Sequence, residues 1–193
     1  MAGSGEPEIT GEAVMAAGRF VVAKRLRWRD ARGVEREWEA ADRLDDRGAV
    51  LVIAWLKPSD RLLLIRQFRP PARRPVLEFP AGMLNDGESP AAAAVRELRE
   101  ETGYLAGEVR LGPAAYSTPG LSGELVFTAE TEIDETAPGN LRPETEFDPS
   151  ESIETILVPR LDLAAFYRRE IRAGSAFDAK LAAYLAGLAG REA

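Results

Sequence analysis

The chain has 193 residues, which is long enough for one domain with a full hydrophobic core and short for two. Its net charge of −7, from 25 Lys and Arg against 32 Asp and Glu, argues against unspecific binding to nucleic acid or to anionic membranes. The sequence contains neither cysteine nor histidine, which excludes disulfides, Cys or His metal sites, and catalysis by Ser-His or Cys-His pairs.

The N-terminal part predicts a β-hairpin outside the main domain. Residues 1–12 are polar and carry no segment typical of a secretory signal, so we expect a mobile start and a cytoplasmic protein. Two alternating runs, 20–29 and 34–43, flank a turn signal at 30–33. We therefore expect residues 1–46 to form an extension and residues 47–193 to form the main domain.

The rest of the chain predicts strands on both sides of a central helix, followed by two terminal helices. The longest wholly apolar run, 49–56, is too short to cross a bilayer. Apolar and alternating runs predict strands at 49–55, 61–67, 76–80, 108–116, 125–133 and 152–159, and helices at 161–172 and 178–188. This order suits an α/β/α sandwich with a mixed β-sheet.

The central helix is predicted over residues 90–102. Ser89 can cap its N-terminus, Pro90 suits the first helical position, and Gly103 suits a left-handed end. Ala91, Ala94, Val95 and Leu98 would form an apolar face against the sheet.

Three carboxylates crowd the last turns of this helix. Glu97, Glu100 and Glu101 are three or four residues apart, and they lie at the end where the helix dipole disfavours anions. A role as oxygen ligands for a hard divalent cation would explain why the sequence accepts both the repulsion between these carboxylates and the unfavourable helix dipole. The alternative is a solvated acidic helix in which Arg96 pairs with Glu100.

The full spacing of this stretch resembles the Nudix box. Gly82 is followed after five residues by a glutamate, and seven residues later by Arg-Glu-aliphatic-any-Glu-Glu-any-Gly-apolar, with Tyr104 as the last apolar position. The matching positions are Gly82, Glu88, Arg96, Glu97, Leu98, Glu100, Glu101, Gly103 and Tyr104. The resemblance to Nudix hydrolases implies the Nudix fold, an α/β/α sandwich, and cleavage of a nucleoside diphosphate linked to another group.

Beyond the box, the chain resembles the ADP-ribose pyrophosphatase branch, in particular the dimeric ADP-sugar diphosphatases. The matching stretches are 67–71, 77–82, 119–122, 151–154 and 177–180, and Pro119 stands where the branch has its usual proline. This implies a homodimer that hydrolyses ADP-ribose or a related ADP-sugar to AMP and a sugar phosphate. Thr118 stands where close relatives carry an aspartate, which leaves the sugar open.

The same resemblance assigns roles within the box. Glu97 and Glu101 would bind Mg²⁺, or alternatively Mn²⁺, with Glu100 assisting and the Ala81 carbonyl as a backbone ligand. Glu88 and Arg96 would form a structural ion pair, while Gly82 and Gly103 would serve backbone geometry.

The branch takes its general base from the loop before the last strand, where Glu151 is the best match. Glu144, Glu146 and Glu154 are rivals, each of which could equally be a solvated charge.

Substrate binding is expected at two further places. Arg69 matches an arginine that contacts the phosphates, with a salt bridge across the turn as the alternative. Trp38, with Glu39 and Arg43, matches the hairpin that contacts adenine across the dimer interface, and Phe20 stands in place of a second Trp. Packing in the core or interface is the alternative for both aromatic residues.

Two other functions are weighed against ADP-sugar hydrolysis. GDP-mannose or another nucleotide sugar would use the same chemistry. A nucleotide-sensing module without catalysis is the alternative of another class; its box usually lacks carboxylates, whereas none is missing here.

Overall fold

The computed structural model describes residues 5–45, 47–146 and 152–190, which fold into two compact units. Unit 1 comprises Met1–Gly48 and Ala114–Val126, and unit 2 comprises Ala49–Pro113 and Phe127–Ala193. The division near residue 46 was expected on the sequence, but the assignment of 114–126 to unit 1 was not. The interpretation as one main domain with an N-terminal extension stays a prediction, and each unit is described below by itself.

Unit 1 contains a three-stranded antiparallel sheet in the order β1-β2-β3. The predicted hairpin is present as β2 (Val21–Arg29) and β3 (Glu35–Arg43). The expectation of a mobile start is wrong from residue 8 onward, because β1 (Glu8–Ala17) pairs with β2. Cross-strand ion pairs of Glu8 with Arg29 and of Glu12 with Lys24 hold this polar strand in place.

Eight strands form the second sheet, in the order β11-β6-β5-β4-β9-β8, with β10 paired to β5 and β7 paired to β4. Their bounds are β4 (Ala49–Lys57), β5 (Arg61–Arg69), β6 (Arg74–Glu78), β7 (Ala81–Met83), β8 (Val109–Tyr116), β9 (Leu125–Asp134), β10 (Ile153–Pro159) and β11 (Ala176–Phe177). The sheet is mixed, since β11 runs parallel to β6 while β10 and β6 run antiparallel to β5. The sequence did not indicate the short strands β7 and β11.

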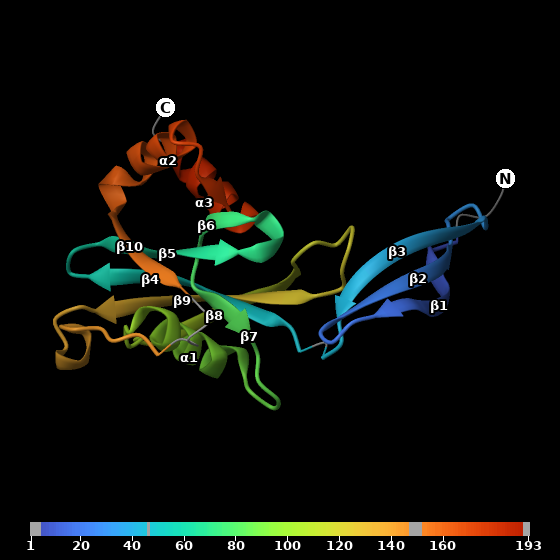
Figure 1. The fold of residues 1–193 in the computed structure, drawn as a ribbon, viewed down its shortest axis with the longest axis horizontal. Coiled ribbons are helices and arrows are strands. Elements are labelled where there is room, and N and C mark those ends of the chain that lie inside the picture. Colours follow the sequence, from blue (N-terminus) through green and yellow to red (C-terminus); the bar gives the residue numbers. More distant parts are fainter. Residues whose placement is uncertain (1–4, 46, 147–151, 191–193) are drawn as a thin grey trace. The chain divides into compact units, whose positions relative to one another are not determined.

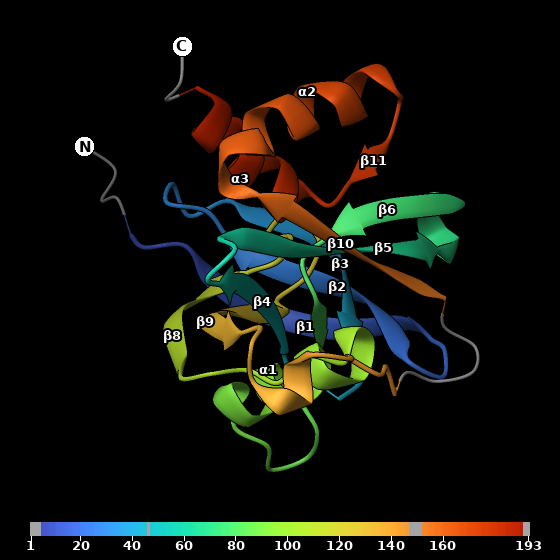
Figure 2. The same cartoon turned by 90° about the vertical axis from the view of Figure 1, so that its left-hand side faces the viewer.

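Helices cover both faces of the sheet in unit 2, as Figure 1 and Figure 2 show, and this confirms the predicted sandwich. Helix α1 (Pro90–Thr102) packs on one face, and α2 (Leu163–Arg172) and α3 (Ala179–Ala189) pack on the other. Single 3₁₀ turns lie at Pro70–Ala72, Pro138–Asn140 and Arg160–Asp162.

The core on the α1 side joins the helix to the middle of the sheet. Ala93, Ala94 and Leu98 of α1 are fully buried against a cluster that includes Val52 and Leu63. Val95, which was expected on this face, is 42% exposed, because one residue along a helix turns the side chain by about 100° away from Ala94. The apolar stripe therefore fixes which way the carboxylates of α1 point.

In the described part of the chain, no helix combines the length and apolar character needed to cross a membrane.

Candidate active site

Helix α1 begins and ends as its sequence predicts. The Ser89 hydroxyl accepts a hydrogen bond from the Ala92 amide at 3.2 Å, and Pro90 occupies the first turn. Gly103 ends the helix with a φ of 75°, a left-handed conformation that glycine adopts without strain. These ends fix the three carboxylates in the last two turns of the helix.

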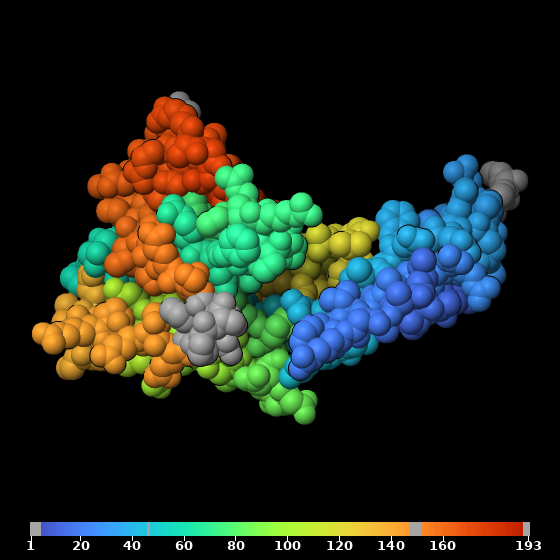
Figure 3. All heavy atoms as spheres, viewed as in Figure 1, coloured from blue at the N-terminus to red at the C-terminus, as the bar shows by residue number. Residues whose placement is uncertain are grey.

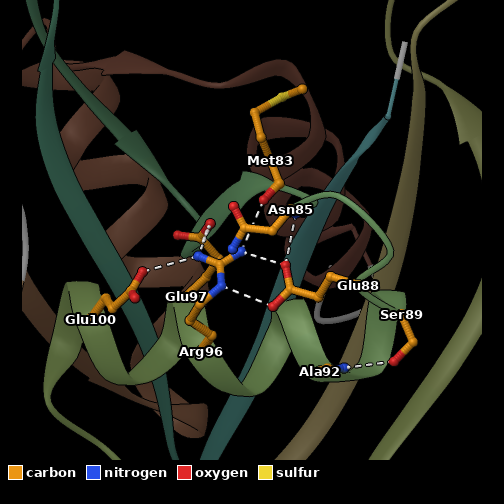
Figure 4. A network of polar contacts seen from close by, with 8 residues as sticks. All are labelled: Met83, Asn85, Glu88, Ser89, Ala92, Arg96, Glu97 and Glu100. Atoms are coloured by element: carbon orange, nitrogen blue, oxygen red, sulfur yellow. Dashed lines mark hydrogen bonds and ion pairs between the residues drawn. The ribbon is translucent and has the colours of Figure 1, made fainter. Parts of the chain in front are cut away.

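The guanidinium of Arg96 lies at the centre of a polar network on α1 (Figure 4). Its Nε and Nη2 donate to the two oxygens of Glu88 at 2.9 and 2.8 Å, and Nη2 also donates to the Met83 carbonyl at 3.0 Å. Its Nη1 donates to Glu97 at 2.7 Å and to Glu100 at 3.0 Å. One arginine thus holds the loop before the helix and two of its carboxylates together.

This network changes the protonation of Glu88. The hydrogen bonds from Arg96, with a further one from the Asn85 amide, hold the pKa of Glu88 at about 2 although burial opposes the shift. The carboxylates of Glu88, Glu97 and Glu100 raise the pKa of Arg96, and Glu88 is the largest cause. The pair is therefore ionised throughout the physiological range.

The strand β7 lies directly against the carboxylates of α1. Glu101 is only 5% exposed, and its Oε2 accepts a hydrogen bond from the Ala81 amide at 3.0 Å. A Cβ atom built on Gly82 would coincide with the carboxylate of Glu97. Only a residue without a side chain at position 82 lets Glu97 lie where it does.

A second ion pair lies on the sheet of the same unit. Arg69, at the end of β5, donates from Nε and Nη2 to both oxygens of Glu78 on β6, at 2.7 and 2.8 Å. Glu78, Glu101 and Asp178 together raise the pKa of Arg69, and Glu78 contributes most. Sequence reasoning expected Arg69 but missed Glu78; a charged residue inside the apolar run 76–80 was the available signal.

The segment that leads toward the predicted general base runs beside α1. The Glu146 amide donates to the Glu100 carbonyl at 2.8 Å, and Glu146 accepts from Arg99 at 2.7 Å. A Cβ atom on Gly103 would overlap the backbone of Glu144. Figure 3 shows this segment, in gold and orange, beside the green atoms of α1.

Of the candidates for the general base, Glu151 lies outside the described residues. Glu154 is paired with Arg66, which also contacts Glu170 of α2. Leu157 of β10 packs against the α1 core. Side chains alternate along a strand, and Glu154 is three residues from Leu157, so the two side chains point to opposite faces of the sheet. Glu154 therefore points to the far side of the sheet from α1, whereas Glu144 and Glu146 lie beside the helix.

Unit 1 holds the residues predicted to bind the base. Trp38 is 51% exposed, and its Nε1 donates to the Gly120 carbonyl at 3.1 Å. Arg43 pairs with Glu124 at 2.8 Å. Because side chains alternate along β3, Glu39 and Arg43 share one face and Trp38 lies on the other.

The remaining aromatic candidate of unit 1, Phe20, is 65% exposed, and the guanidinium of Arg19 lies 5.0 Å from the centre of its ring. Its exposure rules out packing in the core of unit 1.

Comparison with known proteins identifies the family of this chain. The sequence model of the NUDIX domain matches residues 45–177, which is more than half of the chain. The chain belongs to the Nudix family. It is 37% identical to the ADP-sugar pyrophosphatase of Mus musculus over 82% of this chain and 76% of that protein.

A second relative agrees with this membership, and a solved structure shares the fold. The ADP-ribose pyrophosphatase of Bacillus subtilis is 38% identical over 70% of this chain and 68% of its own length. The solved structure of an ADP compounds hydrolase superposes with a TM-score of 0.65 at 23% identity, covering 83% of this chain and 84% of that one, and this supports the fold. The protein is thus a Nudix hydrolase, as its box indicated.

Nudix hydrolases generally need a divalent metal, and the chemistry of the donor set in this Nudix protein fits one. Ala81, Glu97, Glu100 and Glu101 offer carboxylate and carbonyl oxygens, the ligands that hard divalent ions prefer. Within residues 5–45, 47–146 and 152–190, however, no three acidic side chains lie close enough together to hold an ion as they stand. Arg96 accounts for part of this, since its Nη1 bonds both Glu97 and Glu100.

Proposed function

We propose that this Nudix hydrolase cleaves the diphosphate bond of ADP-ribose or a related ADP-sugar, with Mg²⁺ as its metal. The observation that carries the proposal is the 37% identity to an ADP-sugar pyrophosphatase over 82% of the chain, together with a Nudix box in which every carboxylate is present. Water adds its oxygen to one phosphorus, the bond from that phosphorus to the bridging oxygen breaks, and AMP and a sugar phosphate are released.

A bound Mg²⁺, held by Glu97, Glu101, the Ala81 carbonyl and Glu100, would supply positive charge to the diphosphate oxygens and activate water. Arg96 orients Glu97 and Glu100 through its Nη1 while it anchors the preceding loop through Glu88. Gly82 leaves room for the Glu97 carboxylate.

Arg69 and Glu151 complete the proposed machinery. The Arg69 guanidinium binds the diphosphate through the edge that faces away from Glu78, since Glu78 engages its Nε and Nη2 side and fixes the plane of the group. Glu151 accepts the proton of the attacking water. Trp38, Glu39, Arg43 and Phe20 are the proposed contacts of the adenine, with Trp38 on one face of β3 and Glu39 and Arg43 on the other.

We also propose that the protein is a homodimer formed through unit 1. Unit 1 exposes large apolar side chains, among them Ile9 and Val14 of β1 and Phe20 between β1 and β2, each 63–65% exposed. Light scattering on the purified protein should give twice the chain mass of 21.0 kDa. A monomer mass at micromolar concentration would contradict this part of the proposal.

A substrate panel tests the main proposal. The purified protein is incubated with ADP-ribose, another ADP-sugar and GDP-mannose in Mg²⁺, and the released nucleotide is quantified by chromatography. We expect AMP from ADP-ribose with a kcat/KM at least about tenfold above that for GMP from GDP-mannose. The reverse order would favour the GDP-mannose alternative, and tight binding of ADP-ribose without AMP release would favour a sensor module.

A further inference from the structure

A buried amide on β5 has an oxygen without a partner. Gln67 is 7% exposed, and its Oε1 accepts no hydrogen bond. It is the one fully buried side-chain polar atom in the described part of unit 2 for which this is so. Because an unsatisfied buried acceptor destabilises a fold, its presence calls for an explanation beyond packing.

The strand register places Gln67 between Arg69 and the level of Glu78 on one face of the sheet. In the β5–β6 ladder, Arg69 stands two pairs beyond Gln67, and Ile65, the partner of Glu78, stands two pairs before it. Residues directly opposite each other share a face, so Arg69, Gln67 and Glu78 all lie on one side of the sheet. Gln67 therefore stands between the positions of Arg69 and Glu78 along this face, and these two residues are joined by an ion pair.

This side of the sheet is the one that α1 covers. Leu63, four residues before Gln67 on β5, packs in the cluster that contains Leu98 of α1. Arg66, the residue next to Gln67, points to the other face of the sheet, where it donates a hydrogen bond to Glu170 of α2. Gln67 thus belongs to the same layer as the α1 carboxylates and Arg69, and a pure core position would be filled by an apolar residue such as Ile65.

We propose that Gln67 is a specificity residue whose Oε1 accepts a hydrogen bond from a hydroxyl of the sugar attached to the diphosphate. The inference rests on the proposed function. An amide oxygen repels phosphate oxygens, which suit the neighbouring Arg69 guanidinium, so its partner must be a donor. On a nucleoside diphosphate sugar, the donors adjacent to the phosphates are sugar hydroxyls, and the second sugar distinguishes this substrate from other ADP esters.

The test compares wild type with Gln67→Met, which fills the same volume without the amide. Removing an unsatisfied acceptor should leave the melting temperature equal or higher. The KM for ADP-ribose should rise about tenfold while kcat changes less, because a ligand hydroxyl loses its acceptor. With the β-methyl ester of ADP, which yields AMP and methyl phosphate and has no second sugar, the KM of the variant should match wild type within about twofold.

Ile65→Met is the matched control, since it changes an apolar residue on the same face of the same strand and should leave both KM values unchanged. Equal KM values of wild type and Gln67→Met for ADP-ribose, or an equal rise for both substrates, would overturn the inference while wild-type turnover leaves the proposed function intact. Absence of AMP release by the wild type would instead overturn the proposed function, and the inference with it.

Discussion

Arg96 links the two halves of the Nudix box through one planar group. Its bonds to Glu88 and the Met83 carbonyl hold the loop, and its bonds to Glu97 and Glu100 hold the helix. A lysine could not replace it, because a single ammonium cannot reach oxygens on several sides in fixed directions. The like-charge repulsion that the sequence suggested among the carboxylates is therefore offset, at Glu97 and Glu100, by this one cation.

The pKa of Glu88 predicts a loss of stability in acid. Its folded-state pKa of about 2 lies below the ordinary 4.5, so the stabilisation is complete above pH 4.5 and is lost as the pH falls toward 2. We expect wild type to be more stable than Glu88→Gln near pH 6, and the difference to shrink steadily as the pH falls from 4.5 to 2. Urea unfolding of both proteins at several pH values measures this difference; a difference that stays constant with pH would contradict the ionised pair.

At the scale of elements, the site depends on how closely β7 approaches α1. Glu101 bonds the Ala81 amide, and Glu97 lies over the bare Cα of Gly82. Both contacts join a three-residue strand to the last turns of a helix that is fixed by its own caps. The position of the carboxylates is thus a property of the strand–helix pair rather than of α1 alone.

Substituting Gly82 by alanine tests this dependence. The new methyl group must displace the Glu97 carboxylate, which is the end of a flexible side chain, so the free energy of unfolding should change by less than about 1 kcal/mol. Turnover of ADP-ribose should fall about 100-fold, because a displaced ligand misaligns the site. The measurements are steady-state kinetics and urea unfolding.

The matched control is Gly187→Ala in α3, where nothing lies within 4 Å of the added methyl group. It should stabilise the helix by about 0.5–1 kcal/mol and leave turnover unchanged. Full activity of Gly82→Ala would show that the position of Glu97 does not matter for the reaction.

The bounds of α1 could be predicted to the residue, because Ser89, Pro90 and Gly103 determine the helix ends through local capping and backbone conformation. The strands β7 and β11 escaped prediction because three and two residues carry too little periodicity, and pairing with β4 and β6 creates them. The Glu88–Arg96 pair was implied by the resemblance to the Nudix box. Glu78 and Gln67 did not, because their importance comes from a register between strands that the sequence does not show.

At the scale of the whole molecule, the proposed functions are divided between the two units. The carboxylates, Arg69 and Gln67 belong to unit 2, and Trp38, Glu39 and Arg43 belong to unit 1 together with the segment 114–126. That segment is tied to β3 inside unit 1, where the Ala41 amide donates to the Leu121 carbonyl at 2.9 Å. If a substitution in unit 1 changes the KM of the reaction assigned to unit 2, then residues of both units contribute to substrate binding.

Trp38→Ala provides this substitution. Because stacking on a base stabilises the ground and transition states alike, we expect the KM for ADP-ribose to rise about tenfold with a smaller change in kcat. Trp38→Phe serves as the control, since it keeps an aromatic ring but loses the bond to Gly120, and it should retain most of the affinity. A fall in kcat at unchanged KM would show that Trp38 only packs.

The central claim is that the carboxylates of α1 bind the divalent ion that this hydrolase uses, and Mn²⁺ binding to wild type and Glu101→Gln by titration calorimetry tests it most directly. Glu101 is buried against Ala81, and glutamine keeps its shape but removes its charge, so the fold should persist. We predict Mn²⁺ binding by wild type and by the exposed-site control Glu108→Gln, and at least about tenfold weaker binding by Glu101→Gln. Equal binding by all three proteins, or no binding by wild type, would contradict the account.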